Sequence, residues 1–216
     1  MSNADFNISH FHQGFCIYVE CSEEYSDAEL MKHLGISGYN TLFTEDSPHQ
    51  PSGRDRFVQI ANDGRWVHVS DDRYYTLLND EYYGSRQLRD RIVTFARLHN
   101  IFVRQLGDAD GSFEFEYYEG SKLRRRYEFI DPRWKPEDCV AIDFGETLPG
   151  EEDLSEEVDM FEKVTRIEDA LGIETDETKL SIRTYTKPYP KRSFFGRLLE
   201  KPDPDNLWKW CPWEWH

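Results

Sequence analysis

Apolar and polar residues alternate over the first part of the chain in patterns typical of short strands and helices. Residues 15–19 (Phe-Cys-Ile-Tyr-Val) form an apolar, β-branched and aromatic run, which predicts a buried strand. Ser26 with Glu29 three positions later is a capping-box pattern, an apolar stripe follows it, and Gly35 supplies a terminator. The pattern therefore predicts a strand followed by a short helix.

A first hairpin is predicted around Asp63-Gly64, a dipeptide favoured in two-residue turns. Pairing Asn62 with Arg65 sets Ile60 opposite Val67, and both residues then face the core. Downstream, Ser85 is placed to cap a helix that ends near position 100, and residues 101–106 predict a further strand.

The order up to this point is strand, helix, strand, strand, helix, strand. This order is typical of the split βαβ or ferredoxin-like arrangement. We predict an α+β protein with a ferredoxin-like core, in which a mostly antiparallel sheet carries its helices on one face.

A second hairpin, with strands predicted over residues 112–118 and 122–129 around Gly120, extends this sheet. We favour a three-residue loop, because it keeps the aromatic residues together on one face and sets Glu114 opposite Arg126 on the other. An ion-paired sheet surface then accounts for the glutamates of this strand.

The C-terminal part begins with a short strand predicted over 139–144 and a helix over 154–160. A capping box from Thr165 to Glu168 predicts a second helix, closed by Gly172. Residues 181–186 alternate in polarity and predict a late edge strand. C-terminal helices thus follow the second hairpin.

The sequence divides into three parts: a flexible N-terminus (1–14), a single α+β domain (15–186) and a tail rich in proline and tryptophan (187–216). Exposed tryptophans promote aggregation, so we expect the tail to dock. We favour docking on the same chain, and the alternative is a homodimer joined through this tail.

Charge excludes some function classes. With 26 Lys+Arg against 42 Asp+Glu, the net charge of -16 repels phosphate, so we predict no nucleic-acid partner. No apolar run approaches the ~20 residues that span a bilayer, so we predict no membrane partner. The 4 cysteines form no C-x-x-C pattern, and we expect a cytoplasmic protein with reduced thiols.

No motif for catalysis, nucleotide binding or metal binding stands out. His10 and His12 share an H-x-H spacing, but no third ligand lies nearby, so we predict no metal site and no cofactor. Adjacent carboxylates alone do not form an acid/base pair, which needs defined separation in a cleft. We therefore predict no catalytic residues.

Two features favour binding to a protein. An acidic, tyrosine-rich connector spans residues 71–83, and residues 151–177 are strongly acidic. Tyrosine offers rigid amphipathic contact area, and negative potential attracts basic partners. The predicted binding residues are Asp71, Asp72, Tyr74, Tyr75, Tyr82, Tyr83, Glu156, Glu157, Trp208 and Trp210.

Several landmarks between about residues 15 and 175 also suggest relatives. They are Gly64-Arg65-Trp66-Val67, Ser70-Asp71-Asp72, Tyr118-Glu119-Gly120, Asp159-Met160-Phe161 and Ala170-Leu171-Gly172. In these the chain resembles a broad group of small bacterial α+β proteins without assigned activity, some encoded beside polymorphic toxin systems. The resemblance implies a small cytoplasmic bacterial protein and transfers no catalytic residues.

Together these observations predict a non-enzymatic, acidic protein-binding module, with an immunity-type inhibitor of a basic toxin as its specific form. The alternative is an enzyme or small-ligand binder with a cleft near His68 and Asp71 or Asp72, where a hairpin strand ends.

Overall fold

The computed structural model describes residues 14–21, 25–36, 38–39, 41–43, 56–71, 85–107, 111–130, 139–152 and 159–187. This part of the chain is α+β, as predicted. Its elements are β1 (Phe15–Glu20), α1 (Asp27–Leu34), β2 (Thr41–Phe43), β3 (Arg56–Asn62), β4 (Trp66–Asp71), α2 (Ser85–Phe95), β5 (Ile101–Leu106), β6 (Phe113–Glu119), β7 (Lys122–Phe129), β8 (Val140–Gly145), α3 (Met160–Leu171), the 3-10 turn η1 (Glu177–Lys179) and β9 (Arg183–Lys187).

Within the described residues, the strands form one 9-stranded sheet in the order β2-β9-β3-β4-β1-β5-β6-β7-β8. Every neighbouring pair is antiparallel. The sheet is larger than the predicted core. The prediction of β9 as an edge strand is wrong, because β2 pairs with its outer side and β3 with its inner side. The sequence had not indicated β2.

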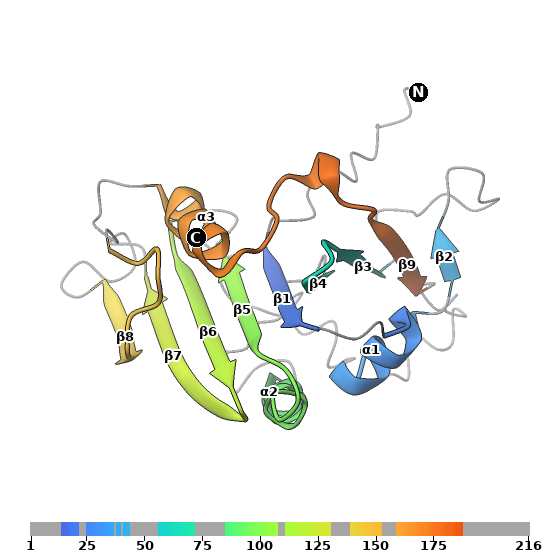
Figure 1. Cartoon of the computed structure of the whole chain (residues 1–216), viewed down its shortest axis with the longest axis horizontal. Helices are drawn as coiled ribbons and strands as arrows, with labels where there is room; N and C mark the ends of the chain where they lie inside the picture. The colour runs from blue at the N-terminus through green and yellow to red at the C-terminus, as the bar shows by residue number, and fades with distance from the viewer. Residues whose placement is uncertain are drawn as a thin grey trace, which may run out of the picture.

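Both faces of the sheet are buried at its centre, where β1 lies between β4 and β5. Ile17 and Val19 pack in a core with α1 and α2, whereas Cys16 and Tyr18 pack in a second core that includes Ile167 of α3. Figure 1 shows α3 on the opposite side of the sheet from α1 and α2. The helices α1 and α2 thus share one face, and α3, one of the predicted C-terminal helices, covers the second face.

Local capping signals set the ends of α1 as predicted. The Ser26 side chain accepts a hydrogen bond from the Glu29 N–H, and the Glu29 carboxylate accepts one from the Ser26 N–H in return. Gly35 ends the helix with φ +73°, a left-handed conformation that glycine adopts without strain. The helix buries its apolar stripe against the sheet.

α3 begins earlier than the sequence predicted. Asp159 is its N-cap and accepts a hydrogen bond from the Phe161 N–H at 2.8 Å, so Thr165 lies inside the helix. The start at Thr165 was wrong because the buried stripe of Val164 and Ile167 continues back to this cap. Gly172 ends α3 as predicted. The helix predicted over 154–160 falls largely outside the described residues.

The first hairpin has a longer turn than predicted. Asn62 pairs with Val67, and Ile60 pairs with Val69, a shift of two positions from the predicted register. The shift preserves the buried faces, since side chains alternate with a period of two. The Asp63 side chain accepts hydrogen bonds from the turn's own N–H groups, which lengthens the loop.

The second hairpin has a two-residue turn, not the predicted three-residue loop. Glu119 pairs with Lys122, and Gly120 and Ser121 both have positive φ, of 56° and 66°. A register shift between Tyr117 and Tyr118 then restores the aromatic pairing further along the strands. The bulge makes a tight turn compatible with a continuous apolar face. The prediction had assumed one register along the whole hairpin.

Several predictions concern residues outside the described ranges. These are the flexible N-terminus, the His10 and His12 pair, and the docking of the tail in cis or in a homodimer. Among the described residues, no helix is long and apolar enough to span a membrane.

Candidate functional site

Almost all of the binding residues predicted from the sequence lie outside the described part of the chain. Asp71 is the exception, since its backbone ends β4 opposite Phe15 and Val58. The others are Asp72, Tyr74, Tyr75, Tyr82, Tyr83, Glu156, Glu157, Trp208 and Trp210.

His68, the centre of the alternative cleft, is a buried residue of the second core. Its Nε2 lies 3.0 Å from Asp63 Oδ2, and both side chains are almost inaccessible, with 0% and 6% exposure. The Tyr18 ring packs edge-on against the imidazole. A side chain enclosed in this way is a structural group, so the geometry does not support His68 as a residue of an open cleft.

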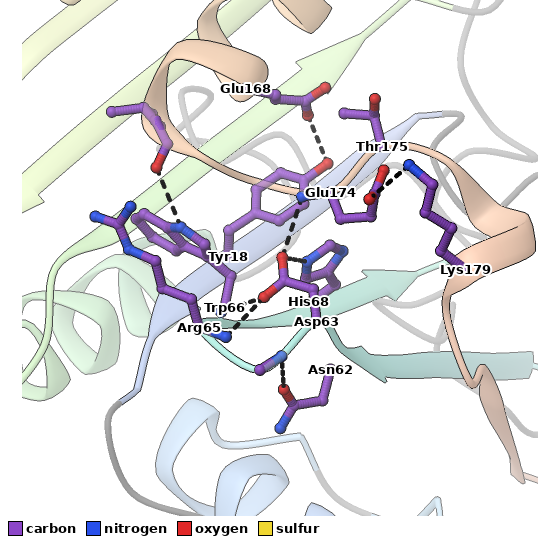
Figure 2. Close-up of polar contacts among 12 residues, drawn as sticks. Tyr18, Asn62, Asp63, Arg65, Trp66, His68, Glu168, Glu174, Thr175 and Lys179 are labelled. Carbon is purple, nitrogen blue, oxygen red and sulfur yellow. Dashed lines mark hydrogen bonds and ion pairs between the residues drawn. The ribbon is translucent and has the colours of Figure 1, made fainter.

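Asp63 connects the turn of the first hairpin to the segment after α3. Its carboxylate accepts hydrogen bonds from the N–H groups of Arg65, Trp66 and Glu174, at 2.8, 2.6 and 3.1 Å. Figure 2 shows the carboxylate between the His68 ring and the Glu174 backbone. Burial alone raises the pKa of Asp63, but the hydrogen bonds from His68 and these N–H groups outweigh it and hold the pKa well below its usual range.

A second buried network fastens α3 to the centre of the sheet. Arg104 Nε donates to Glu168 Oε1 at 2.7 Å, and the Tyr18 hydroxyl donates to the same oxygen at 2.5 Å. Burial raises the pKa of Tyr18 well above its usual range, so the hydroxyl keeps its proton. Glu168 belongs to the acidic segment 151–177, yet its charge is balanced inside the protein.

Glu151, from the same acidic segment, is also internal. Its carboxylate accepts hydrogen bonds from Arg125 Nη2 at 2.6 Å and Nε at 2.9 Å, and Arg125 also bonds Asp143. The backbone N–H of Leu148 donates to it as well. The segment therefore contributes less to the surface field than its net charge suggests.

The remaining polar cluster lies on the α1–α2 side of strands β5 to β8, and we call it the Glu114 patch. Cross-strand pairing aligns Gln105 with Glu114 and Glu114 with Glu128, and the next row aligns Glu116 with Arg126. Cross-strand partners share a face of the sheet. The patch consists of Gln105, Glu114, Glu116, Arg126 and Glu128.

Glu116 is the balanced member of the patch. It lies 3.2 Å from Arg89 Nη2, which α2 supplies, and 3.5 Å from Arg126 Nε. The Tyr118 hydroxyl donates to its second oxygen at 2.5 Å. Two cations and a hydroxyl thus hold this buried carboxylate, as buried charge requires.

Glu114 differs, because its Oε1 is buried and has no hydrogen-bond partner among the described residues. Gln105 Oε1, from the cross-strand neighbour, is in the same condition. Burial raises the pKa of Glu114 to about 8, with the help of the Glu128 and Glu116 charges, and Arg126 and Arg89 oppose the shift only in part. Arg126 Nε of the same patch is likewise a buried atom without a hydrogen-bond partner in the part of the chain that the structure describes. Such groups are uncommon in folded interiors.

The sequence did not reveal this patch. The alternation of Phe113, Glu114, Phe115 and Glu116 suggested one apolar face and one solvated, ion-paired face. The structure places Glu114 opposite Glu128, not opposite Arg126 as predicted, because the bulge shifts the register. No local signal indicates that the polar face is also buried.

The patch borders the exposed edge of the sheet. Ile142 and Phe144 of β8 pair with Glu128 and Arg126, so they continue the two rows of the patch on the same face. Phe144 is 53% exposed. The Glu128 carboxylate and the Arg126 guanidinium thus lie between the buried part of the patch and the apolar side chains of β8.

Neither the arrangement of possible metal ligands nor the comparisons with known proteins point to a cofactor or a relative. In the described ranges, no group of three or more His, Cys, Asp or Glu residues is arranged to hold a metal ion. No family model, curated protein or solved structure matches the chain.

Proposed function

We propose that the protein is a non-enzymatic binding module that captures a basic protein through the Glu114 patch and the adjacent part of β8. The observation that carries the proposal is the exposed Phe144 ring on the edge strand, on the same face of the sheet as the Glu114 and Glu128 carboxylates. A lysine or arginine of a partner would pair with the Glu128 carboxylate, which lies between Glu114 and Ile142 in one row of the sheet.

The charge of the chain supports this proposal. A net charge of -16 accelerates the encounter with a basic partner and disfavours acidic ones. Ile142 and Phe144 would then contribute apolar contact beside the polar groups, the combination typical of a protein interface.

The other perturbed groups also favour binding over catalysis. Asp63 with His68, and Tyr18 with Arg104 and Glu168, satisfy one another inside the protein. Each of these networks fastens a turn or a helix to the sheet. This structural role is enough to explain why the residues of each network are buried and charged.

The proposal also covers the fold type of the core, the kind of partner and the cellular location. We infer that β1, β3, β4 and β5 with α1 and α2 form a ferredoxin-like unit, and the order β3-β4-β1-β5 with both helices in one core supports this. The resemblance to proteins encoded beside toxin systems supports an immunity-type role against a basic toxin. A cytoplasmic location belongs to the same proposal, since the sequence holds only 4 cysteines, without a C-x-x-C pattern.

A second candidate function rests on Glu114 alone. A carboxyl group whose pKa lies at about 8 holds a proton at neutral pH, as a general acid must. A small polar ligand bound beside the patch would meet this group. Loss of a turnover activity in Glu114→Gln, with binding of the basic partner unchanged, would favour the enzyme over the binding module.

The experiment that tests the binding role compares two double variants. The chain retains its partner from an extract of the source organism, and the affinity for the purified partner is measured. We expect Glu114→Gln/Glu128→Gln to bind at least about tenfold more weakly, a loss of about 1.4 kcal/mol. Glu119→Gln/Glu162→Gln is the matched control, because these side chains are 51% and 58% exposed, away from the patch.

The control double variant should bind within about twofold of the wild type, since single exposed charges contribute little. Equal affinity of the patch variant and the wild type, with both proteins folded, would contradict the proposal.

A further inference from the structure

The outer edge of β8 is the longer of the two sheet edges. β8 is the last strand of the sheet and has 6 residues, whereas β2 at the opposite end has 3. None of the described strands pairs with the outer side of β8. A strand edge of this length presents backbone donors and acceptors to an incoming chain.

The side chains of β8 connect this edge to the Glu114 patch. Ile142 lies opposite Glu128, and Phe144 lies opposite Arg126. On the other face, Asp143 bonds Arg125 and remains 60% exposed. An added strand would therefore meet Ile142 with Glu128 behind it and Phe144 with Arg126 behind it on one face. On the other face it would meet Asp143, which is paired with Arg125.

We propose that the outer edge of β8 binds an extended, basic segment of the partner by strand addition, with a lysine or arginine reaching across Ile142 to Glu128. The inference rests on the proposed function and deepens it, because it specifies the conformation of the bound segment. Backbone hydrogen bonds supply affinity in this mode, and alternate side chains supply specificity.

The spacing of strands permits this contact. Neighbouring strands lie about 4.8 Å apart, so an added strand would run about 10 Å from β7, one strand beyond β8. Lysine and arginine lay their aliphatic stems on apolar surface and carry the charge at the tip. A stem on Ile142 would bring its cation to the Glu128 carboxylate, whereas Phe144 leads to Arg126.

A second copy of this chain is a poorer occupant of the edge. Two-fold pairing of β8 with itself would bring two equally acidic chains together. Each copy carries a net charge of -16, and like charges directly across strands destabilise pairing. Charge complementarity selects a basic segment.

The test uses a blocked six-residue peptide of alternating lysine and valine as the probe. Two matched controls carry N-methyl groups on alternate amides, one control along each edge of the peptide. The methyl groups remove backbone donors but keep every side chain and charge. We expect the parent peptide to bind, and the control methylated on its pairing edge to bind at least about tenfold more weakly. Fluorescence anisotropy measures both affinities.

Hydrogen exchange locates the bound peptide. The parent peptide should slow amide exchange in residues 140–145 and leave residues 41–43 of the opposite edge unchanged. Glu128→Gln should weaken the parent peptide severalfold, whereas Glu119→Gln should not.

Three results would overturn the inference. They are equal binding of parent and methylated peptides, protection at residues 41–43 in place of 140–145, and a dimer with residues 140–145 protected in the absence of peptide. If only this inference fails, partner affinity still depends on Glu114 and Glu128. If the proposed function fails, that dependence is absent as well.

Discussion

At the scale of single residues, the decisive contrast is between carboxylates whose charge is balanced by hydrogen bonds and arginines and one, Glu114, whose pKa is raised by burial and neighbouring carboxylates. Glu168 and Glu151 are buried against arginines, and Asp63 accepts hydrogen bonds from several N–H groups. Glu114 is buried among other carboxylates, with an oxygen that accepts no hydrogen bond. Buried carboxylates with partners stabilise the fold, whereas a carboxylate such as Glu114 lowers its stability. A binding function would explain why such a carboxylate is present.

Glu114→Gln should make the protein more stable, increasingly so as the pH rises. The folded-state pKa of about 8 exceeds the ordinary value of 4.5, so the wild type loses stability from about pH 4.5 up to about pH 8. The free energy of unfolding of the wild type falls by at most about 1.4 kcal/mol per pH unit in this range. Urea unfolding across this range measures the difference, with Glu119→Gln as the exposed control. A difference between Glu114→Gln and wild type that does not grow with pH would contradict the raised pKa.

Asp63→Asn should lower the free energy of unfolding by about 3 kcal/mol at neutral pH, because an amide cannot accept all of these hydrogen bonds and hydrogen bonds to charged groups are strong. The lowered pKa of Asp63 means that this stability is present above about pH 4 and disappears as the pH falls further. Thermal or urea unfolding of the variant, beside the exposed Asp90→Asn, tests both points. A loss that persists unchanged below pH 3 would argue against an ionised Asp63 as its source.

At the scale of elements, the sequence predicted what neighbouring residues determine. The capping box of α1 and the limits of β5 and β7 follow from local patterns, and the structure confirms them. The register of both hairpins did not follow, because the side chain of Asp63 lengthens one turn and a bulge alters the other. β2 is 3 residues long and pairs with β9, more than 140 positions later, which no local pattern indicates.

The candidate site was missed for a related reason. Glu114 and Glu116 alternate with phenylalanines as on a half-exposed strand, and only the neighbouring strands and Arg89 of α2 bury them. The residues that sequence reasoning selected in their place fall almost entirely outside the described ranges. Burial on both faces of one strand is a tertiary property.

The turn of the second hairpin gives a prediction at this scale. Ser121 has a φ of 66°, a conformation that costs an L-residue about 1 kcal/mol and glycine nothing. Ser121→Gly should therefore raise the free energy of unfolding by up to about 1 kcal/mol, and Gly120→Ala should lower it. Urea unfolding of the two variants checks the signs, and a stabilised Gly120→Ala would refute the turn geometry.

At the scale of the whole molecule, charge and the open edge of the sheet support the same function. Several acids of segment 151–177 are balanced internally, so the attraction for a basic partner depends on the surface carboxylates and the Glu114 patch together. The apolar side chains of β8 would then add apolar contact with the partner to the electrostatic attraction.

Binding of the partner should weaken at least about tenfold between low and high salt, because exposed charges are screened over about 10 Å at 0.1 M salt. Affinity measured over a series of sodium chloride concentrations gives the slope. The apolar contact with Phe144 is insensitive to screening, so Phe144→Ser should lower the affinity without altering the slope. A salt-independent affinity would remove the electrostatic contribution.

The most direct test of the central claim is a calorimetric titration of the partner at about pH 7, in two buffers of different ionisation enthalpy. Glu114, with its pKa at about 8, holds a proton in the free protein, and a cation bound beside it favours the ionised form. The account predicts that binding releases close to one proton from the wild type and none from Glu114→Gln. Binding without proton release, or with equal release from both proteins, would contradict it.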